Sequence, residues 1–430
     1  MGFLAILLLI VLMTIGVPVA LSFAAVLAYL VFIYDVSMTT LLLQGFRSLD
    51  HIVLLALPLF VLAGYLMKSG GIARRLVDFI EMLVRGRRGG LGASMVFASG
   101  IFGAISGTAS GAVASIGTIM IDPLAKRGYP RGYASALLGI SSLLGILIPP
   151  SVTMILFGVV TRQSITALFA ATIGPAFLLM IGLTLFNRFC VGRLFDEKPS
   201  GGEQNQKVAS RWSITKSALP ALSLPFLILG SIYGGISTPT EAAAVAVVAA
   251  IIIGFLVYKD LTLSRLKESV IESAETTGTI MLILLFSFMI GRILTAERVP
   301  QELTEWITTL VQNPLLILLM VNAFLIATGM IMDDLSVTVV IAPLLMPLVL
   351  SVGVDPIHYG AIVACSVVIG ANSPPVAPVL YMACRIGQVS IHRAVMPAIW
   401  MILVVGLPVM MITTFFPEVS LFIPRMLGAL

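Results

Sequence analysis

Long uncharged windows alternate with short charged segments along the whole chain. A membrane hydrocarbon core about 30 Å thick needs about 20 helical residues to cross it, and many windows approach that length. Backbone polar groups must be satisfied within such a segment, and the strict alternation of a membrane barrel strand is missing, so the windows predict helices. These windows are residues 1–34, 51–67, 89–121, 132–161, 163–187, 217–240, 242–258, 276–291, 306–332, 335–354, 356–384 and 394–417.

The segments between the windows are of two kinds. Residues 39–49, 72–84 and 261–271 place apolar side chains on one face and charged ones on the other, which suits a helix at the membrane surface. Such helices serve as connectors, as braces or as docking surfaces for a partner. Residues 191–215 are rich in Gly, Ser, Gln and charged residues, which predicts a polar linker near the middle of the chain.

A shift of 225 residues aligns unusual features of the two parts of the chain. Gly145 then meets Gly370, and each of these glycines is followed, after three residues, by a proline pair. Proline pairs are uncommon inside apolar helices, because proline removes a backbone donor and clashes with the preceding turn. The match therefore predicts two repeats, at residues 1–190 and 216–430.

Two apolar stretches predict re-entrant hairpins. Residues 89–121 have basic residues on both sides, which place both ends in the cytoplasm, and they are too few for two full crossings. The shifted counterpart, residues 314–346, has mainly acidic flanks, so the simplest arrangement is an inverted-topology repeat with one hairpin entering from each face. The flanking charges are Arg85, Arg87, Arg88, Lys126, Arg127 and Arg131 for the first stretch, and Glu302, Glu305 and Asp355 for the second.

Each repeat also holds two places where a predicted helix is interrupted. These are the hairpin tips, near residues 103–111 and 328–336, and the proline pairs in the broken helices 132–161 and 356–384. Uncoiled main chain at membrane depth is tolerated only where it is buried in protein or lines a polar cavity. Freed carbonyls and hydroxyls suit a hard cation such as Na⁺, and half-helix N-termini suit a carboxylate.

Each interruption taken alone also has an ordinary explanation. Runs of small residues allow close helix packing, a proline pair produces a kink, and an aspartate such as Asp333 caps a helix. A charged carboxylate at mid-membrane costs about 2.5–3.5 kcal/mol on insertion scales, so Asp333 beside Asp334 is a functional candidate by default. The paired occurrence of all four interruptions favours a binding site.

Composition excludes several other classes of protein. Apolar residues make up 59% of the chain and charged residues only 10%, against about 25% charged in an ordinary soluble domain. The net charge of +5 includes no basic tract interleaved with aromatic residues, so no nucleic-acid partner is predicted. The three cysteines and three histidines are scattered, and no metalloprotease, serine-hydrolase or Walker motif occurs, so the chain is not predicted to be an enzyme.

The first hairpin tip at residues 106–111, the two Gly-x3-Pro-Pro strings and the string at residues 353–360 resemble the large membrane subunit of tripartite ATP-independent periplasmic (TRAP) transporters. The resemblance covers nearly the whole chain. It implies Na⁺-driven import of a small organic acid, such as a C4-dicarboxylate or sialic acid, across the bacterial inner membrane. It also implies a small four-helix membrane subunit and a soluble periplasmic substrate-binding protein as partners, with lipid around the chain. The implied fold is an elevator, in which a transport domain carrying both hairpins slides against a scaffold.

The resemblance also implies site residues. Family members often carry a Leu-x-Thr-Pro-Pro-Val-Gly type string where residues 371–377 read ANSPPVA, so the substrate class stays open. The extra amide of Asn372 favours a polyhydroxylated acid such as sialic acid. The implied Na⁺ ligands are Ser106, Gly145 and Pro149 in one cluster and Gly329, Asp333 and Gly370 in another. The implied substrate contacts are Ser106, Thr108, Asp333 and Asn372.

Two other functions remain open at this stage. A stand-alone Na⁺- or H⁺-coupled transporter of dicarboxylates or citrate would share two hairpins in inverted repeats, and it would need no binding protein. An ion channel would line its pore with the broken helices, although no ring of charges or repeated filter is visible in the sequence.

Overall fold

The computed structural model describes residues 2–84, 87–197 and 210–429, and these segments are almost entirely helical. Among them, seven helices are long and apolar enough to cross a membrane, and a further pair, bent by 44° around residues 148–151, forms a broken span. The only pairing of extended backbone in the described segments is an isolated bridge between Val191 and Phe195. The prediction of an all-α polytopic membrane protein is confirmed.

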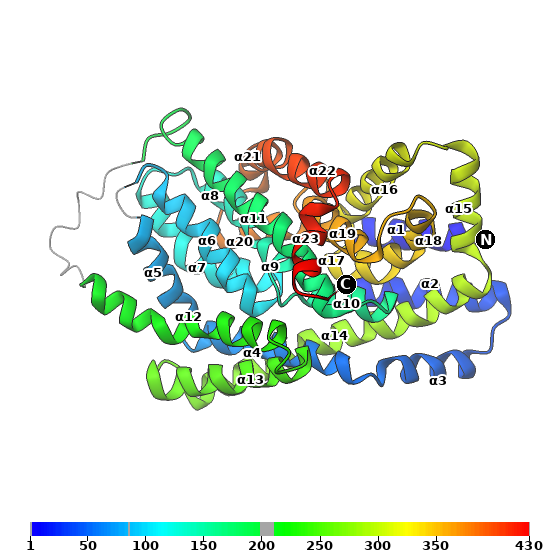
Figure 1. Cartoon of the computed structure of the whole chain (residues 1–430), viewed down its shortest axis with the longest axis horizontal. Coiled ribbons are helices and arrows are strands. Elements are labelled where there is room, and N and C mark those ends of the chain that lie inside the picture. Colours follow the sequence, from blue (N-terminus) through cyan, green and yellow to red (C-terminus); the bar gives the residue numbers. More distant parts are fainter. Residues whose placement is uncertain (1, 85–86, 198–209, 430) are drawn as a thin grey trace.

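The first half of the chain starts with two short apolar helices separated at residues 15–18 and then places a helical hairpin before a broken helix (Figure 1). The helices are α1 Gly2–Thr14, α2 Val19–Tyr34, α3 Met38–Leu49, η1 Ile52–Leu55, α4 Ala56–Ser69, α5 Ile72–Val84, α6 Gly90–Ser106, α7 Ala109–Lys126, α8 Arg131–Ser142, α9 Leu144–Leu147, α10 Val152–Thr161 and α11 Ile165–Cys190. Here α6 and α7 form the hairpin, and α8 to α10 form the broken helix.

The second half has the same order of elements. Its hairpin consists of α16 on one arm and α17, η3 and α18 on the other, and its broken helix consists of α19 and α20. The helices are α12 Arg211–Tyr233, α13 Pro239–Ile252, η2 Ile253–Val257, α14 Leu263–Ala296, α15 Val299–Leu310, α16 Pro314–Gly329, α17 Asp334–Ser336, η3 Val337–Ile341, α18 Ala342–Ser351, α19 Pro356–Gly370, α20 Pro378–Ile386, α21 Ile391–Met401, η4 Ile402–Gly406, α22 Leu407–Phe415 and α23 Glu418–Met426.

The offset between the proline pairs recurs in the helix starts. Ala109 opens α7 and Asp334 opens α17, while Arg131 opens α8 and Pro356 opens α19. Both pairs are separated by the same 225 positions that align the proline strings. The inverted orientation of the two halves in a membrane remains a prediction.

The helices pack in two groups. Helices α1 to α4 pack with α12 to α14, and Figure 1 shows α3, α4, α12, α13 and α14 together along the lower side. The two hairpins and the two broken helices pack with α11 and with α21 to α23, and in Figure 1 they lie above α4, α12, α13 and α14. Helix α4 touches both arms of the first hairpin and α14 touches η3 of the second, so the groups meet at both hairpins. Helix α5 packs against both groups, through α6 and through α12.

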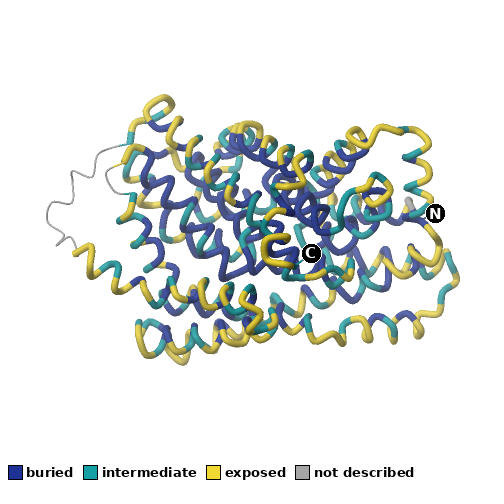
Figure 2. The backbone as a smooth tube through the Cα atoms, viewed as in Figure 1, coloured by how far each residue is buried: buried dark blue, intermediate teal, exposed yellow. Residues whose placement is uncertain are grey.

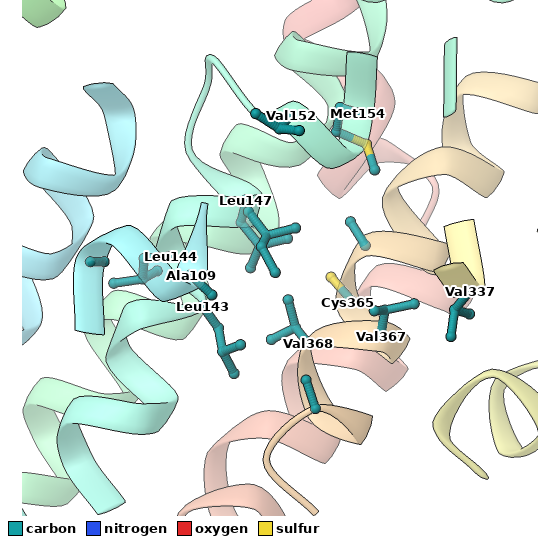
Figure 3. Packing of buried hydrophobic residues seen from close by; sticks show 14 of the residues in the cluster. Ala109, Leu143, Leu144, Leu147, Val152, Met154, Val337, Cys365, Val367 and Val368 are labelled. Atoms are coloured by element: carbon teal, nitrogen blue, oxygen red, sulfur yellow. The ribbon is translucent and has the colours of Figure 1, made fainter. Parts of the chain in front are cut away.

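One continuous core joins the two halves within the hairpin-bearing group. Figure 3 shows Leu143 and Leu147 of the first half facing Val368 of the second, and all three side chains are buried. In a membrane the association of helices depends on close packing rather than on removing apolar surface from water. The complementary fit of these side chains therefore holds the two halves together.

The outer helices present large apolar side chains to their surroundings. Figure 2 shows exposed positions gathered on the lower side, over α3, α12 and α13. Phe226 on α12 is 76% exposed and Ile236, in the α12–α13 turn, is 82% exposed. Such patches are normal where a protein faces lipid or a neighbouring membrane subunit.

Several predicted boundaries differ from the observed ones. The hairpin arms predicted to end at residues 121 and 346 continue to Lys126 and Ser351. The first bound was set by the charge of Asp122 and the second by the 225-residue shift, whereas left-handed Gly128 and Gly353 follow the observed helix ends. The broken helices predicted at residues 132–161 and 356–384 run from Arg131 to Thr161 and from Pro356 to Ile386, close to their predicted bounds.

The surface segment predicted at residues 261–271 is not a separate connector. It falls mostly within α14, a continuous helix of 34 residues, because no glycine or proline interrupts the chain between Leu263 and Thr277. The predicted linker at residues 191–215 is shorter than expected, since α12 already begins at Arg211. Residues 198–209 of that linker lie outside the described residues.

Candidate functional site

The tip of the first hairpin is a tight turn at residues 107–108. Gly107 has a φ of 65°, and a Cβ there would lie 2.9 Å from the carbonyl oxygen of Pro150, so glycine suits this turn. Thr108 caps α7 by accepting a hydrogen bond from the N–H of Gly111 at 3.2 Å. The hydroxyl of Ser106 donates to the carbonyl of Thr108 at 3.4 Å. The turn thus gathers hydroxyl and carbonyl oxygens at one point.

This tip packs on the break between α9 and α10. The N–H of Val152 donates to the carbonyl of Gly107 at 3.0 Å. On the preceding turn the backbones of Gly103 and Gly145 touch, and a Cβ on Gly103 would collide with the Cα of Gly145. These contacting segments carry the implied ligands of the first cation cluster, Ser106, Gly145 and Pro149.

The second hairpin tip meets the second break in the same way. Gly329 ends α16 and Gly370 ends α19, and a Cβ on Gly370 would lie 2.8 Å from the Cα of Gly329. Asp333 caps α17, because its carboxylate accepts hydrogen bonds from the Ser336 N–H, at 3.4 Å, and from the Ser336 hydroxyl. The implied ligands of the second cation cluster therefore lie on neighbouring segments, with the carboxylate of Asp333 in the capping role that the sequence had left open.

Asp334, rather than Asp333, reaches across to the other half of the chain. The hydroxyl of Thr153, in the first turn of α10, donates to a carboxylate oxygen of Asp334 at 2.8 Å. Sequence reasoning identified the aspartate pair but missed Thr153. The available signal was a hydroxyl residue placed two positions after the Pro-Pro-Ser break, in the first turn of the half-helix that follows it.

Asn372 lies elsewhere in the hairpin-bearing group. It is fully buried, and its amide nitrogen donates to the carbonyl of Gly139 on α8 at 3.4 Å. Its amide oxygen is also buried, with no hydrogen-bond partner among the described residues. A buried oxygen without a donor is costly, so this atom suits a bound cation or water. That Asn372 contacts the substrate together with Ser106 and Thr108 stays a prediction.

A cavity of about 240 Å³ opens between the first tip and the other helix group. Helix α4 comes closest to the tip at Gly64, where a Cβ would lie 3.2 Å from both the Cα and the Cβ of Ser106. The polar lining includes Ser106, Thr108 and Ser110 from the tip, Tyr65 and Lys68 from α4, and Glu272 from α14.

Two pairs of polar residues that line this cavity link α4 to α14. The ammonium of Lys68 lies 3.9 Å from a carboxylate oxygen of Glu272, and the hydroxyls of Tyr65 and Thr276 lie 3.0 Å apart. The sequence analysis missed these four residues, because spacing along the chain does not show whether a polar side chain near the end of an apolar window faces the membrane surface or a cavity.

A larger cavity, of about 490 Å³, lies between α3, α14 and the second hairpin. Gln44, Ser287 and Arg292 are among its polar lining residues, and much of the remaining lining is apolar. None of the predicted site residues lines it, so it does not belong to the candidate site.

The candidate site offers oxygen atoms from hydroxyls, carbonyls and single carboxylates. Among the described residues there is no group of three or more His, Cys, Asp or Glu side chains that could hold a transition metal. Hard cations prefer oxygen ligands, so the arrangement at the two tips fits an alkali cation. The N-termini of α7, α10 and α17 begin at these same tips and breaks and carry partial positive charge, which suits an anion.

Comparison with known proteins gives a family match over nearly the whole chain. The family model described as "Tripartite ATP-independent periplasmic transporter, DctM component" matches residues 6–419. A C4-dicarboxylate TRAP transporter large permease protein, DctM, of Pseudomonas aeruginosa is 36% identical over 412 residues, covering 95% of this chain and 94% of the relative. A sialic acid TRAP transporter large permease protein, SiaM, of Vibrio cholerae is 33% identical over 416 residues, covering 96% and 95%.

Among solved structures, the YdaH transporter of Alcanivorax borkumensis has a similar fold. Its TM-score is 0.62 at 15% sequence identity, and the match covers 89% of this chain and 88% of that one. At that identity the likeness concerns the fold alone. It places the observed helix arrangement among transporter folds.

Proposed function

The chain belongs to the family of DctM components of tripartite ATP-independent periplasmic transporters, and from this premise we propose that it imports a small organic acid coupled to Na⁺. The names of its relatives refer to C4-dicarboxylates, sialic acid and isethionate, and all three are organic acids. The observation that carries the proposal is the meeting of two hairpin tips with two helix breaks, linked by the hydrogen bond from Thr153 to Asp334.

Each tip and the break beside it supply one proposed Na⁺ site. Ser106 contributes its hydroxyl to the first site, and the chain near Gly145 and Pro149 contributes carbonyl oxygens. The chain near Gly329 and Gly370 forms the second site, next to the carboxylate of Asp333. Co-transported Na⁺ supplies positive charge beside the acid, so that the acid enters a largely apolar protein as part of a neutral assembly.

The proposed transport mechanism is an elevator. The group that contains both hairpins would move as one body against the group formed by α1 to α4 and α12 to α14. At Gly64 the absence of a side chain lets α4 lie close against Ser106 of the first tip. Helix α5 also links the two groups, through the ion pair of Glu81 with Arg127 on α7 and that of Arg75 with Asp260 before α14, so one of these pairs would have to rearrange in the proposed movement.

The family name describes a tripartite transporter, so two further proteins are proposed as partners. A small four-helix membrane subunit would cover part of the exposed apolar surface, and a soluble periplasmic binding protein would deliver the acid. The chain would then reside in the bacterial inner membrane, with lipid against its remaining apolar faces.

The test is uptake of organic acids into proteoliposomes that contain the chain with its small subunit. Succinate and N-acetylneuraminate serve as labelled probes, and each is supplied with and without the cognate binding protein. An inward Na⁺ gradient is compared with an equal choline gradient and with a pH gradient alone. Uptake that needs both Na⁺ and the binding protein is the expected result.

Three other results would contradict the proposal and favour a different function. Uptake without a binding protein would indicate a stand-alone transporter, and uptake driven only by a pH gradient would exclude Na⁺ coupling. Single-channel currents without a saturable organic substrate would identify an ion channel instead.

A further inference from the structure

The cavity beside the first hairpin tip contains one positive and one negative side chain, Lys68 and Glu272. Every other lining residue that the structure describes is neutral. Both charged side chains are accessible, at 42% and 40% exposure. The cavity therefore has no net charge, although its two charges are separately available to a ligand.

The pair between these two residues is loose. Charge-assisted hydrogen bonds between an ammonium and a carboxylate are about 2.7–2.9 Å long, whereas Lys68 and Glu272 are 3.9 Å apart. An accessible pair at this distance contributes little to stability. The ammonium of Lys68 also lies 5.9 Å from the centre of the Tyr65 ring, so an aromatic face accompanies the cation. A carboxylate entering the cavity can therefore replace Glu272 at Lys68.

The rest of the lining suits neutral polar groups. Ser106, Thr108 and Ser110 present hydroxyls on the hairpin side, and Tyr65 and Thr276 present hydroxyls on the opposite side. A ligand with its own hydroxyl or amide groups can exchange hydrogen bonds with both sides. A second carboxylate would find no second cation among the described lining residues, and it would face the like charge of Glu272.

We propose that Lys68 binds the carboxylate of a singly charged, hydroxyl-bearing organic acid, and that Glu272 discriminates against acids with a second carboxylate. This inference rests on the proposed function, because it assigns the cavity to the transported acid. It goes further in naming the charge class of the substrate and the two residues that select it.

The test measures binding rather than transport. The purified chain with its small subunit is titrated with D-gluconate and N-acetylneuraminate, which carry one carboxylate, and with succinate and L-malate, which carry two. The apparent dissociation constant is taken from the shift of the melting temperature, in Na⁺ and in choline buffer. The variants are Lys68→Gln and Glu272→Gln. The matched control is Arg425→Gln, which removes the cation of the exposed 2.6 Å pair with Glu418 on α23.

The wild-type chain is expected to bind at least one of the two monocarboxylates more tightly than either dicarboxylate. Lys68→Gln should weaken that binding by at least about tenfold, as expected when a charge-assisted hydrogen bond is lost. Glu272→Gln should improve succinate binding relative to the wild type, an effect that a merely structural role would not produce. Arg425→Gln should change neither value.

A rescue experiment distinguishes loss of the Lys68 charge from misfolding of the variant. Lys68→Cys can be modified with 2-aminoethyl methanethiosulfonate, which restores a cation at the same position, while the native cysteines Cys190, Cys365 and Cys384 are all buried. Recovery of monocarboxylate binding after this treatment would support the proposal. Modification with the sulfonate-bearing analogue should give no recovery.

The outcomes separate this inference from the proposed function. Tighter binding of dicarboxylates by the wild type, unchanged binding by Lys68→Gln, or no binding of any of the four acids would overturn the inference. Na⁺-dependent binding that is the same in the wild type and in Lys68→Gln would overturn the inference but leave the proposal of Na⁺ coupling intact. Binding that depends on Lys68 but is equal in choline would overturn Na⁺ coupling and keep the inference.

Discussion

Thr153 and Asp334 lie 181 positions apart in the sequence, and the threonine hydroxyl donates a 2.8 Å hydrogen bond to the aspartate carboxylate. This bond ties the half-helix after the first proline pair to the tip of the second hairpin. Hydrogen bonds to charged groups contribute about 1.5–3 kcal/mol, more than bonds between neutral groups. The bond is therefore positioned to hold the two halves of the candidate site in register.

Replacing Thr153 with valine removes the hydroxyl and nearly preserves the volume. We expect the Na⁺-driven uptake rate to fall by at least about tenfold, because the carboxylate of Asp334 loses a donor in a buried setting. Thr153→Ser keeps the hydroxyl and should retain most of the uptake. Proteoliposome uptake measured on both variants checks the prediction, and equal rates for the valine and serine variants would contradict it.

The backbone contact between Gly103 and Gly145 leaves no room for a side chain. Gly103→Val should push the first hairpin away from the broken helix and destabilise the protein by about 1–3 kcal/mol, the usual range for overpacking. The control is Gly230→Ala on α12, where a Cβ would meet no atom within 4 Å. Melting temperatures in detergent should fall for Gly103→Val and stay the same or rise for Gly230→Ala.

Ser106 is proposed to give its hydroxyl to a Na⁺ ion. Ser106→Ala should raise the Na⁺ concentration needed for half-maximal uptake by several-fold, while uptake at saturating Na⁺ recovers in large part. Ser94 provides a control on the same helix, because its hydroxyl is buried and donates to the carbonyl of Gly90, four residues earlier. If Ser94→Ala and Ser106→Ala shift the Na⁺ dependence equally, Ser106 has no special role.

Asp333 has two proposed roles, as the cap of α17 and as part of a Na⁺ site, and two variants separate them. Asparagine caps helices about as well as aspartate, whereas alanine does not, a difference of about 1 kcal/mol. If the negative charge matters, Asp333→Asn and Asp333→Ala should both abolish uptake while the protein still inserts in the membrane. Normal uptake by the asparagine variant alone would show that Asp333 acts only as a cap.

Alternating access can be followed with cysteines at the two tips. Ser110 is exposed in the cavity at the first tip, and Met330 is partly exposed at the second. Ser110→Cys and Met330→Cys should react with a membrane-impermeant maleimide from opposite faces, and Na⁺ with substrate should change both rates. Labelling of both positions from one face in every condition would rule out the elevator.

Much of the site could be located from the sequence because its elements follow local rules. The proline pairs at positions 149–150 and 374–375 interrupt a helix in any tertiary fold, and Gly107 likewise suits a left-handed turn in any fold. The apolar windows predicted the helices for the same reason, since lipid requires the backbone to satisfy its own hydrogen bonds. The observed offset of 225 positions between the starts of α7 and α17 agrees with the shift that aligned the proline strings.

The contacts between these elements could not be predicted from the sequence in the same way. The resemblance implied that Asn372 contacts the substrate, but residue spacing gave no sign that its amide nitrogen also bonds to the carbonyl of Gly139 on α8. Lys68 ended an apolar window and Glu272 followed a predicted surface segment, whereas the fold brings the two together in a cavity. Neither outcome follows from residue spacing, because each depends on which helix faces are pressed together.

The sequence by itself determined where most of this protein is helical and where its helices break, because hydrophobic windows, proline and glycine act over a few residues. The tertiary structure alone decided that Thr153 meets Asp334 and that Lys68 and Glu272 share a cavity with Ser106. Those contacts join residues far apart in the chain, and their positions follow from the packing of whole helices against one another.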